Sequence, residues 1–275
     1  MDSLHANGGR WDCHTHIYGP WEDFPLPDNA VYRPEEAPIT ALLDMHRRLG
    51  MSHGVLVQAA CYRTDHAALL DAIARTEGRY KGVALLSGSE TDSQLQALYA
   101  AGVRGVRFNF MGHLAERQDL SELKALAERV GSLGFHILLH GKLAQILPIL
   151  DSWRDLTTTL VVDHMARPDV ALDADVDGLA KLRKHLDNEH RWIKLSGIDR
   201  MMSGTDEPWS RALPYARNLL AAAPDRAIWG SDWPHPNIRG ALPDDARLLA
   251  FIEEVCDDKQ AVEEVLVHNP RRLYL

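Results

Sequence analysis

Short apolar runs alternate with longer segments of helical periodicity along most of the chain. Runs rich in β-branched and other apolar residues predict strands at 10–16, 53–60, 80–87, 102–110, 135–141, 157–164, 192–197 and 226–233. Between them, apolar residues recur at helical spacing in 38–50, 65–78, 91–102, 119–134, 173–190 and 210–224. This alternation predicts a parallel sheet with helices packed against it.

The number of repeats separates two architectures of this class. Eight strand–helix repeats within 275 residues are typical of a (β/α)8 barrel of the TIM type. A doubly wound sheet is the alternative, but it normally has a glycine-rich phosphate loop after its first strand. Here HTHIYGP follows the first strand, and no GxGxxG motif occurs. We therefore predict an α/β fold with a single barrel domain over residues 1–275.

Polar side chains recur where the predicted strands end. In a barrel these carboxyl ends meet at one rim, where active sites lie. Burying such groups costs free energy unless they are paired, so their repetition at one rim predicts a shared site. The residues at these positions are His14, His16, Gln58, Arg107, Asn109, His140, His164, Lys194, Ser196 and Asp232.

The first strand carries two histidines one residue apart. Because side chains alternate between the faces of a strand, His14 and His16 are predicted to point the same way, together with Asp12. Two imidazoles aimed into one space can bind a metal or hold a substrate. Taken alone, the pair fits a surface or structural role equally well.

Several of these residues also have a simpler interpretation. His140 follows an apolar run and fits a paired core histidine, while Asp163 fits a helix N-cap. Asp232 lies among turn-forming residues. Lys194 is expected to point into the barrel, where it needs a carboxylate partner. A regular strand would point Asp163 away from His164.

Composition and charge exclude several classes of partner. The chain is 45% hydrophobic and 25% charged, with a formal net charge of −9 and no block of like charges, so nucleic acid and anionic membranes are poor partners. It contains no apolar stretch of membrane-spanning length, and the first residues do not resemble a signal peptide. Cys13, Cys61 and Cys256 form no CxxC pattern, which predicts free thiols and a cytoplasmic location.

Five motifs together resemble one enzyme family. They are DCHTHIYGP, GVRFNF, VVDHMARP, GSDWPHP and the terminal HNPRRLY, and they extend over nearly the whole chain. In this combination the chain resembles the amidohydrolase superfamily, and within it the lactonases of the amidohydrolase-2 branch. These enzymes open pyrone dicarboxylates, muconolactones or sugar-acid lactones in aromatic and sugar-acid catabolism.

The resemblance implies a set of metal ligands. His14, His16, His140 and Asp232 match the divalent-metal ligands of the family, and His164 matches its additional strand-six histidine. No lysine stands at the end of strand five, where binuclear members carry a bridging lysine. One Zn²⁺ or another divalent metal is therefore the expected cofactor. Metal-independent catalysis is the alternative, because several lactonases of this branch use the same histidines without metal.

The chemistry of lactone hydrolysis assigns roles to the same residues. Asp232 is the expected base for water, and His14, His16 and His140 are expected to stabilise the developing oxyanion. His164 would belong to that group or protonate the leaving oxygen. Three other functions remain open: a zinc-dependent decarboxylase of the same superfamily, a lactone isomerase, and a non-catalytic binding barrel.

Arginines indicate an anionic substrate. Arg107 ends a predicted strand and Arg167 follows His164, and guanidinium groups bind carboxylates or sulfonates in a bidentate manner. For Arg107, ion pairing across the barrel mouth is the alternative. Tyr18 is a candidate wall for a flat ring, and His113 stands where the resemblance leads us to expect a further arginine. The predicted partner is a small anionic lactone, and a homo-oligomer remains open.

Overall fold

A computed structural model describes residues 8–111, 119–168, 176–201, 209–238 and 241–275. Eight parallel strands form one sheet in sequence order. They are β1 (Arg10–Thr15), β2 (Met51–Val57), β3 (Tyr80–Ala84), β4 (Val103–Asn109), β5 (His136–His140), β6 (Leu160–Val162), β7 (Arg191–Lys194) and β8 (Ala227–Ile228). The predicted (β/α)8 barrel in a single domain is confirmed.

The sheet is closed by hydrogen bonds between β1 and the segment that follows β8. The backbone N–H of Cys13 donates to the Trp229 carbonyl at 2.8 Å, and that of Asp232 donates to the His14 carbonyl at 2.8 Å. Because the bonds continue past the end of β8, the loop that carries Asp232 is held directly against β1.

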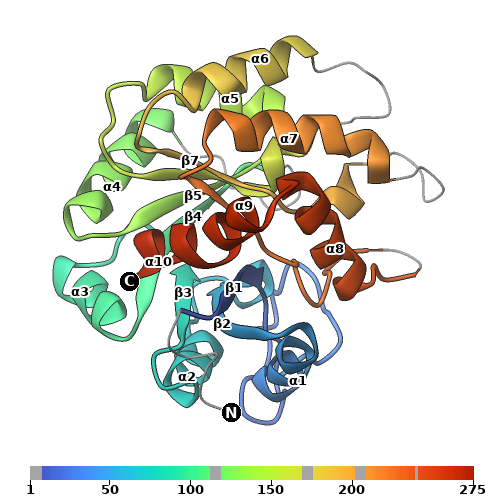
Figure 1. The fold of residues 1–275 in the computed structure, drawn as a ribbon. Coiled ribbons are helices and arrows are strands. Elements are labelled where there is room, and N and C mark those ends of the chain that lie inside the picture. Colours follow the sequence, from blue (N-terminus) through green and yellow to red (C-terminus); the bar gives the residue numbers. More distant parts are fainter. Residues whose placement is uncertain (1–7, 112–118, 169–175, 202–208, 239–240) are drawn as a thin grey trace.

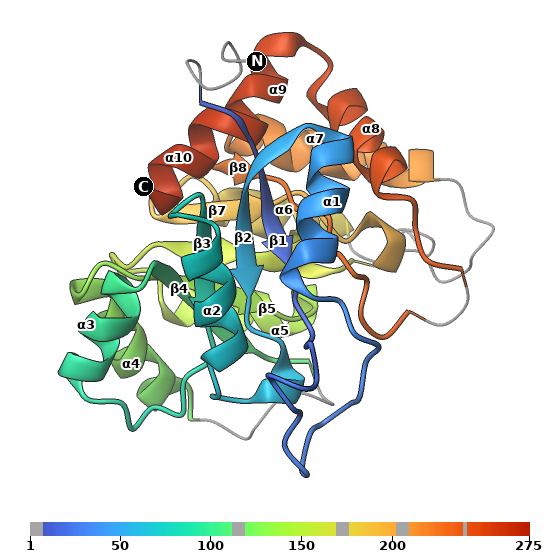
Figure 2. The ribbon, with the colours of Figure 1, turned by 90° about the horizontal axis from the view of Figure 1, so that it is seen from below.

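Helices surround the strands, as Figure 1 shows. They are α1 (Ile39–Leu49), α2 (Ala67–Arg75), α3 (Asp92–Ala100), α4 (Leu120–Ser132), α5 (Leu143–Ser152), α6 (Val176–His185), α7 (Leu213–Ala222), α8 (Asp245–Cys256), α9 (Lys259–Glu263) and α10 (Asn269–Tyr274). In Figure 2, β1 and β2 run away from α9 and α10 towards loops at the opposite end. The last two helices therefore lie over the amino-terminal end of the barrel.

The apolar core has two parts. A larger cluster joins the strands to the surrounding helices, and a smaller one fills the barrel. The smaller cluster consists of Trp11, Cys13, Val55, Val57, Val83, Leu138, Val161, Trp192, Ile228 and Tyr274. Burial of each large apolar side chain contributes about 1.5–3 kcal/mol. This packing makes the barrel interior solid, so a ligand must bind at a rim.

Two predicted strands are shorter than expected. The strand predicted at 157–164 ends at Val162, and the one predicted at 226–233 covers only Ala227–Ile228. The reason is backbone conformation: residues 164–167 all have positive φ, between 46° and 58°, and Asp232 has φ 65°. Left-handed residues cannot continue an extended strand. Helices α5, α8, α9 and α10 were not among the predicted segments.

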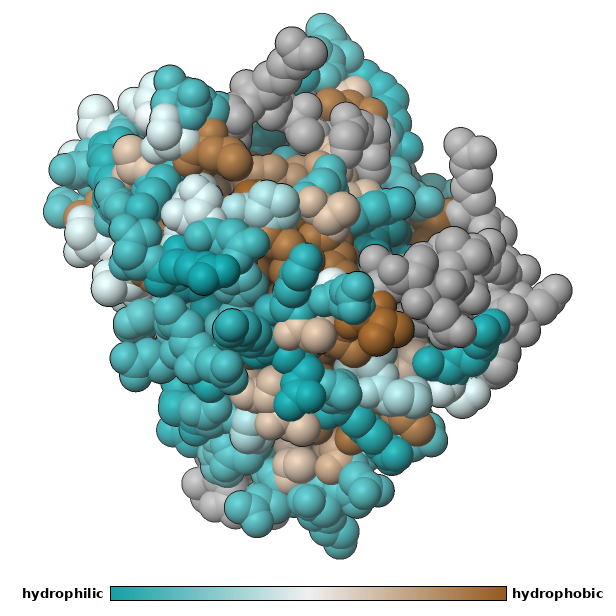
Figure 3. Space-filling view, turned by 90° about the horizontal axis from the view of Figure 1, so that it is seen from above, coloured by the Kyte–Doolittle hydropathy of each residue, from teal (hydrophilic) through white to brown (hydrophobic). Residues whose placement is uncertain are grey.

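No helix in the described part of the chain is both long and apolar enough to cross a membrane. The face drawn in Figure 3 is mostly hydrophilic, with small apolar areas between polar side chains.

Candidate active site

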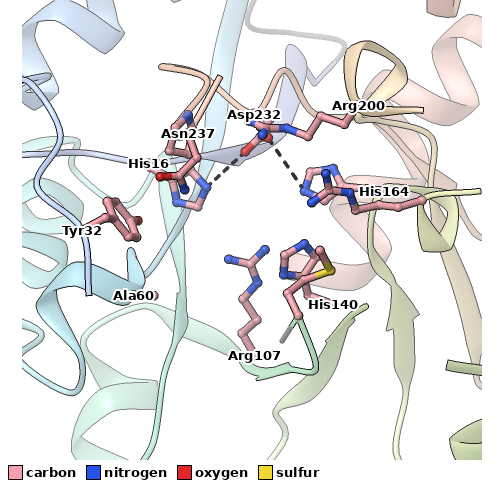
Figure 4. Close-up of a pocket in the computed structure, with 12 residues that line it drawn as sticks. His16, Tyr32, Ala60, Arg107, His140, His164, Arg200, Asp232 and Asn237 are labelled. Atoms are coloured by element: carbon pink, nitrogen blue, oxygen red, sulfur yellow. Dashed lines mark hydrogen bonds and ion pairs between the residues drawn. The ribbon is translucent and has the colours of Figure 1, made fainter. Parts of the chain in front are cut away.

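A cavity of about 190 Å³ opens at the carboxyl-terminal rim of the barrel. Its lining combines imidazole, guanidinium and carboxylate groups from several strands and the loops after them (Figure 4). The residues that line it are His16, Tyr32, Ala60, Arg107, Met111, His140, His164, Arg167, Arg200, Asp232, Pro236 and Asn237.

The two histidines of the first strand meet at this site. The Nε2 atoms of His14 and His16 are 3.3 Å apart, and both side chains are buried. Asp12 does not join them, because its carboxylate contacts His46 of α1 at 3.2 Å. The pairing of β1 with β2 is irregular between Asp12 and Thr15, which breaks the simple alternation that placed all three side chains on one face.

Asp232 has partners on both carboxylate oxygens. Its Oδ1 lies 3.1 Å from His16 Nε2 and 3.6 Å from His14 Nε2. Its Oδ2 forms an ion pair with the NH2 atom of Arg200 at 2.7 Å. Burial raises the pKa of Asp232, but the Arg200 charge and the neighbouring imidazoles outweigh it, so the pKa lies well below its ordinary value. The carboxylate is thus ionised at neutral pH.

The left-handed turn after β6 brings His164 and Arg167 to the same cavity. The Nδ1 atom of His164 lies 2.9 Å from the Ser196 hydroxyl. Its Nε2 atom lies 3.6 Å from Asp163 Oδ2 and 4.0 Å from Asp232 Oδ2. A run of left-handed non-glycine residues is costly and is typical of functional sites.

The prediction that Asp163 points away from His164 is wrong. The strand ends at Val162, directly before Asp163, so Asp163 turns inwards and is completely buried. It contacts His14 Nδ1 at 3.1 Å, Arg107 NH2 at 3.2 Å and Lys194 Nζ at 3.4 Å. The expectation that Lys194 lies inside the barrel with a carboxylate partner is confirmed.

His140 has a different environment from the other imidazoles. Its Nδ1 atom lies 3.1 Å from Asn109 Oδ1, which can only accept a hydrogen bond, so Nδ1 donates. Burial, with Arg107 acting in the same direction, holds the pKa of His140 well below its ordinary value. His140 is therefore neutral, and its ring lies 5.5 Å from that of His164, centroid to centroid.

Three arginines face the cavity with unused donors. Arg107, Arg167 and Arg200 each have a buried Nε atom that makes no hydrogen bond within the described residues. Arg107 and Arg167 were predicted, whereas Arg200 was missed because it follows β7 in the 3-10 helix Ile198–Arg200. An Asp-Arg pair just beyond the polar end of strand seven was the available signal.

The predicted aromatic wall involves a different tyrosine. Tyr18 is completely buried behind the cavity, and its hydroxyl lies 3.2 Å from that of Tyr32, which lines the cavity. Tyr32 belongs to the long loop between β1 and α1, and no periodic pattern fixes such a residue. Asn237 was missed for the same reason. His113 lies outside the described residues.

The donor atoms fit a single divalent metal. Two groups of possible ligands occur in the described part of the chain: His14, His16 and Asp232, and His14, Asp163 and His164, with ligand atoms within 4.8 Å in each. The first offers two imidazoles and one carboxylate, which suits Zn²⁺ with an open position. His16 Nδ1 donates to the Val57 carbonyl at 2.8 Å, which orients its Nε2 atom for coordination. His140 belongs to neither group, so three of the four predicted ligands are brought together.

Known proteins share this architecture over nearly its full length. The chain is 36% identical to a 2-pyrone-4,6-dicarboxylate hydrolase of Comamonas testosteroni over 97% of this chain and 90% of that protein. It is 32% identical to a 4-sulfomuconolactone hydrolase of Rhizobium radiobacter, with the same coverage of each. A solved Acinetobacter baumannii structure, described as a "probable 2-pyrone-4,6-dicarboxylic acid hydrolase" with citric acid bound, superposes with a TM-score of 0.83 at 26% identity. That match covers 96% of this chain and 98% of the other.

A family model described as amidohydrolase matches residues 11–275, which include all the strand-end residues predicted for the site. On this match and these identities, the chain belongs to the amidohydrolase family.

Proposed function

We propose that this protein is a lactone hydrolase that opens a small anionic lactone. The observation that carries the proposal is the set of three arginines whose buried Nε atoms make no hydrogen bond to any described residue, around a cavity that also holds Asp232 and the histidines. Buried donors without partners are costly, so they indicate a ligand rich in acceptors. Guanidinium groups bind carboxylates and sulfonates particularly well.

The cavity sets the size of the substrate. A volume of about 190 Å³ is below the range of sites for drug-sized ligands, so it suits a single substituted ring. The relatives named above act on 2-pyrone-4,6-dicarboxylate and on 4-sulfomuconolactone, which are both small anionic lactones. The apolar part of the wall consists of Tyr32, Ala60, Met111 and Pro236.

Asp232 is the proposed base. Its low pKa keeps the carboxylate ionised, but Arg200 occupies Oδ2 in the structure described here. A substrate carboxylate that binds Arg200 would draw the guanidinium away and free Oδ2 to accept a proton from water. Asp199 can hold Arg200 in its new position, because its carboxylate oxygens make no hydrogen bond in the described part of the chain and one lies 3.6 Å from Arg200 Nε.

The histidines are proposed to complete the reaction. His14 and His16 stand beside Asp232, where they can stabilise the negative charge that develops on the carbonyl oxygen when water attacks. The Ser196 hydroxyl can donate to His164 Nδ1, which leaves the proton of a neutral His164 on Nε2. From there it can pass to the ring oxygen as the ester bond breaks.

A metal is compatible with the same arrangement. His14, His16 and Asp232 would hold it, and when bound it would supply Lewis acidity towards the carbonyl oxygen. The roles of the arginines in holding the anion, and of His164 as proton donor, are the same with or without it.

The test is ultraviolet-monitored ring opening of 2-pyrone-4,6-dicarboxylate, followed by 4-sulfomuconolactone and sugar-acid lactones. We expect turnover with one of them and a fall of about 10²–10⁴-fold in kcat for Asp232→Asn, the usual contribution of general base catalysis. Asp44→Asn, an exposed carboxylate on α1, is the matched control and should retain full activity.

Product analysis separates the alternatives. Ring opening with release of one acid equivalent supports hydrolysis. A change of ring size without acid would identify an isomerase, and release of CO₂ would identify a decarboxylase. Full activity in Asp232→Asn would refute the assigned base.

A further inference from the structure

The carboxylate of Asp12 joins the first strand to the loop that carries Asp232. Asp12 belongs to β1 and is completely buried. Its Oδ1 atom accepts a hydrogen bond from the backbone N–H of His14 at 3.1 Å and another from that of Ser231 at 3.0 Å. The two donors lie on opposite sides of the junction at which the barrel closes. One oxygen atom therefore fixes the backbone of both sides.

The backbone hydrogen bonds across this junction are irregular at the point that the carboxylate bridges. Cys13 N–H donates to the Trp229 carbonyl, and Asp232 N–H donates to the His14 carbonyl, each at 2.8 Å. In a regular strand, adjacent residues such as Cys13 and His14 do not bond to the same neighbouring segment, so the pairing shifts here. The N–H of Ser231 lies between these two bonds. The side-chain oxygen takes the place of a backbone acceptor for it.

The loop after β8 also approaches β1 very closely. A Cβ atom added to Gly230 would lie 2.5 Å from the backbone nitrogen of His14 and 2.9 Å from its Cα, so a side chain here would push the loop away. Asp232, two residues further on, has φ 65°, a left-handed conformation that a non-glycine residue keeps only when its surroundings hold it. The hydrogen bond to Ser231 lies between the close approach and this strained residue.

The other oxygen of Asp12 is held by the surrounding elements. Its Oδ2 atom lies 3.2 Å from Nε2 of His46 on α1, and His46 Nδ1 lies 2.5 Å from the hydroxyl of Tyr80, the first residue of β3. Both side chains are buried. A carboxylate only accepts hydrogen bonds, so His46 donates to it. Rotation of the carboxylate would break bonds on both of its oxygens, which makes it a fixed point for the loop.

We propose that Asp12 is a positioning residue for Asp232. By fixing the N–H of Ser231 against β1, it places the next residue so that Asp232 Oδ1 lies 3.1 Å from His16 Nε2 and 3.6 Å from His14 Nε2. Misplacement of a reacting group by about 1 Å lowers a rate about 10²-fold. The inference rests on the proposed function only where Asp232 is taken as the base, since the position of its carboxylate does not depend on the reaction.

The first test is backbone amide hydrogen exchange, measured by NMR on the whole chain without a lactone. Ile137, which donates to the Thr159 carbonyl at the amino end of the barrel, is the reference amide. Asp12→Ala should accelerate exchange at Ser231 and Asp232 relative to Ile137 by about tenfold or more, the effect of losing one hydrogen bond to a charged group. Unchanged ratios would overturn the proposal. A Ser231 amide that exchanges freely in the native chain would also overturn it, even if Asp12→Ala does not fold.

Two further variants separate positioning from a general structural role. His46→Leu removes the partner of Oδ2 but leaves Oδ1 with both of its donors. It should lower the Tm while the exchange ratios and kcat stay native. Asp12→Asn keeps an oxygen atom that can accept both hydrogen bonds, so it should keep the native ratios too. Equal acceleration in His46→Leu and Asp12→Ala would mean that the packing of α1 holds the loop, which refutes the role of Oδ1.

The second test is steady-state kinetics with a lactone that the native chain opens. Asp12→Ala should lower kcat about 10- to 100-fold and change KM by less than about twofold, because the arginines proposed to hold the anion lie on other elements. Asp12→Asn should restore most of the lost kcat. Gly230→Ala should reproduce the fall, since it displaces the same loop and leaves the carboxylate of Asp12 in place.

The two readouts keep this inference separate from the proposed function. A native kcat in an Asp12→Ala chain whose Ser231 amide exchanges fast would show that Asp232 does not depend on the bridge, which refutes positioning. A raised KM with native kcat would refute it as well. Absence of turnover with every lactone would refute the proposed function alone, because the exchange ratios still decide whether Asp12 places Asp232.

Discussion

Strand β5 carries a histidine at each end, and the two differ in their surroundings. His136 begins the strand and His140 ends it, and both are buried. Burial lowers the pKa of both, to about 3 for His136 and well below the ordinary value for His140. In burial and in the direction of the pKa shift, the two side chains are alike.

Their contacts are not alike. His136 makes no hydrogen bond through either ring nitrogen within the described residues, and its ring packs edge-on against Tyr274 at 5.3 Å. His140 donates to Asn109 and lines the cavity. Burial and a shifted pKa therefore do not identify a functional histidine. Its position along the strand does, because the amino end of the barrel is filled and the carboxyl end is open.

The largest expected effects come from two arginines that, like the two histidines, lie at the filled amino end and at the open carboxyl end of the barrel. Arg191, the first residue of β7, is buried and donates to the Trp153 and Leu156 carbonyls at 2.7 and 3.1 Å. Arg167, at the cavity, has a buried Nε atom from which no described residue accepts a hydrogen bond. Arg167→Met should raise the KM for an anionic lactone about 10- to 100-fold, since a charged hydrogen bond contributes about 1.5–3 kcal/mol. Steady-state kinetics measures the KM, and thermal unfolding measures the stability of the variant.

Arg191→Met is the counterpart at the filled end. It should lower the free energy of unfolding by about 1.5–3 kcal/mol or more, because several carbonyls lose their donor. The KM of the folded fraction should be unchanged. If Arg167→Met instead loses stability with its KM intact, the arginine is a structural residue and the contrast between the two ends fails.

Substitution of His136 and His140 should have a smaller effect on activity, but it compares the two ends of the barrel directly. His140→Leu should lower kcat/KM about tenfold through loss of a neutral hydrogen-bonding group at the cavity, while His136→Leu should change it by less than about twofold. His136→Leu also removes two buried nitrogens that lack partners, so the free energy of unfolding should stay level or increase. Equal losses of activity in both variants would show that distance from the rim does not separate their roles.

The same contrast explains what the sequence could predict. His14, His16, His140, His164 and Asp232 were identified because the apolar runs that predict strands end at these residues, and parallel strands bring all their carboxyl ends together. His16, His164 and Asp232 in fact lie just beyond the ends of β1, β6 and β8. The periodic pattern thus determined both the barrel and the location of its site.

Residues outside the predicted strands could not be placed in this way. Arg200 and Tyr32 reach the cavity from a 3-10 helix and a loop, whose course depends on tertiary contacts such as the hydrogen bond from Tyr18 to the Ala37 carbonyl. The orientation of Asp163 was mispredicted because left-handed residues interrupt the strand directly after it. Each error occurs where the backbone leaves regular alternation.

The smallest expected effect concerns the pH dependence of stability. The pKa of His136 is about 3 in the native chain against an ordinary value of 6.5, so between these values the unfolded chain binds a proton that the native chain does not. The free energy of unfolding must therefore decrease as the pH is lowered from about 6.5 towards about 3, and full stability is present above 6.5.

His136→Leu should remove this contribution. Unfolding of the variant should take up about one proton fewer, so its free energy of unfolding should decrease less steeply as the pH is lowered. Urea denaturation at a series of pH values between 4 and 8 measures the slope directly. Above about pH 7 the two chains should show parallel curves, because a histidine is neutral in both states there. An unchanged slope between pH 4 and 6 would mean that the native chain accepts a proton on His136. The amino end of the barrel would then admit a charge, and the distinction between a filled and an open end would no longer hold.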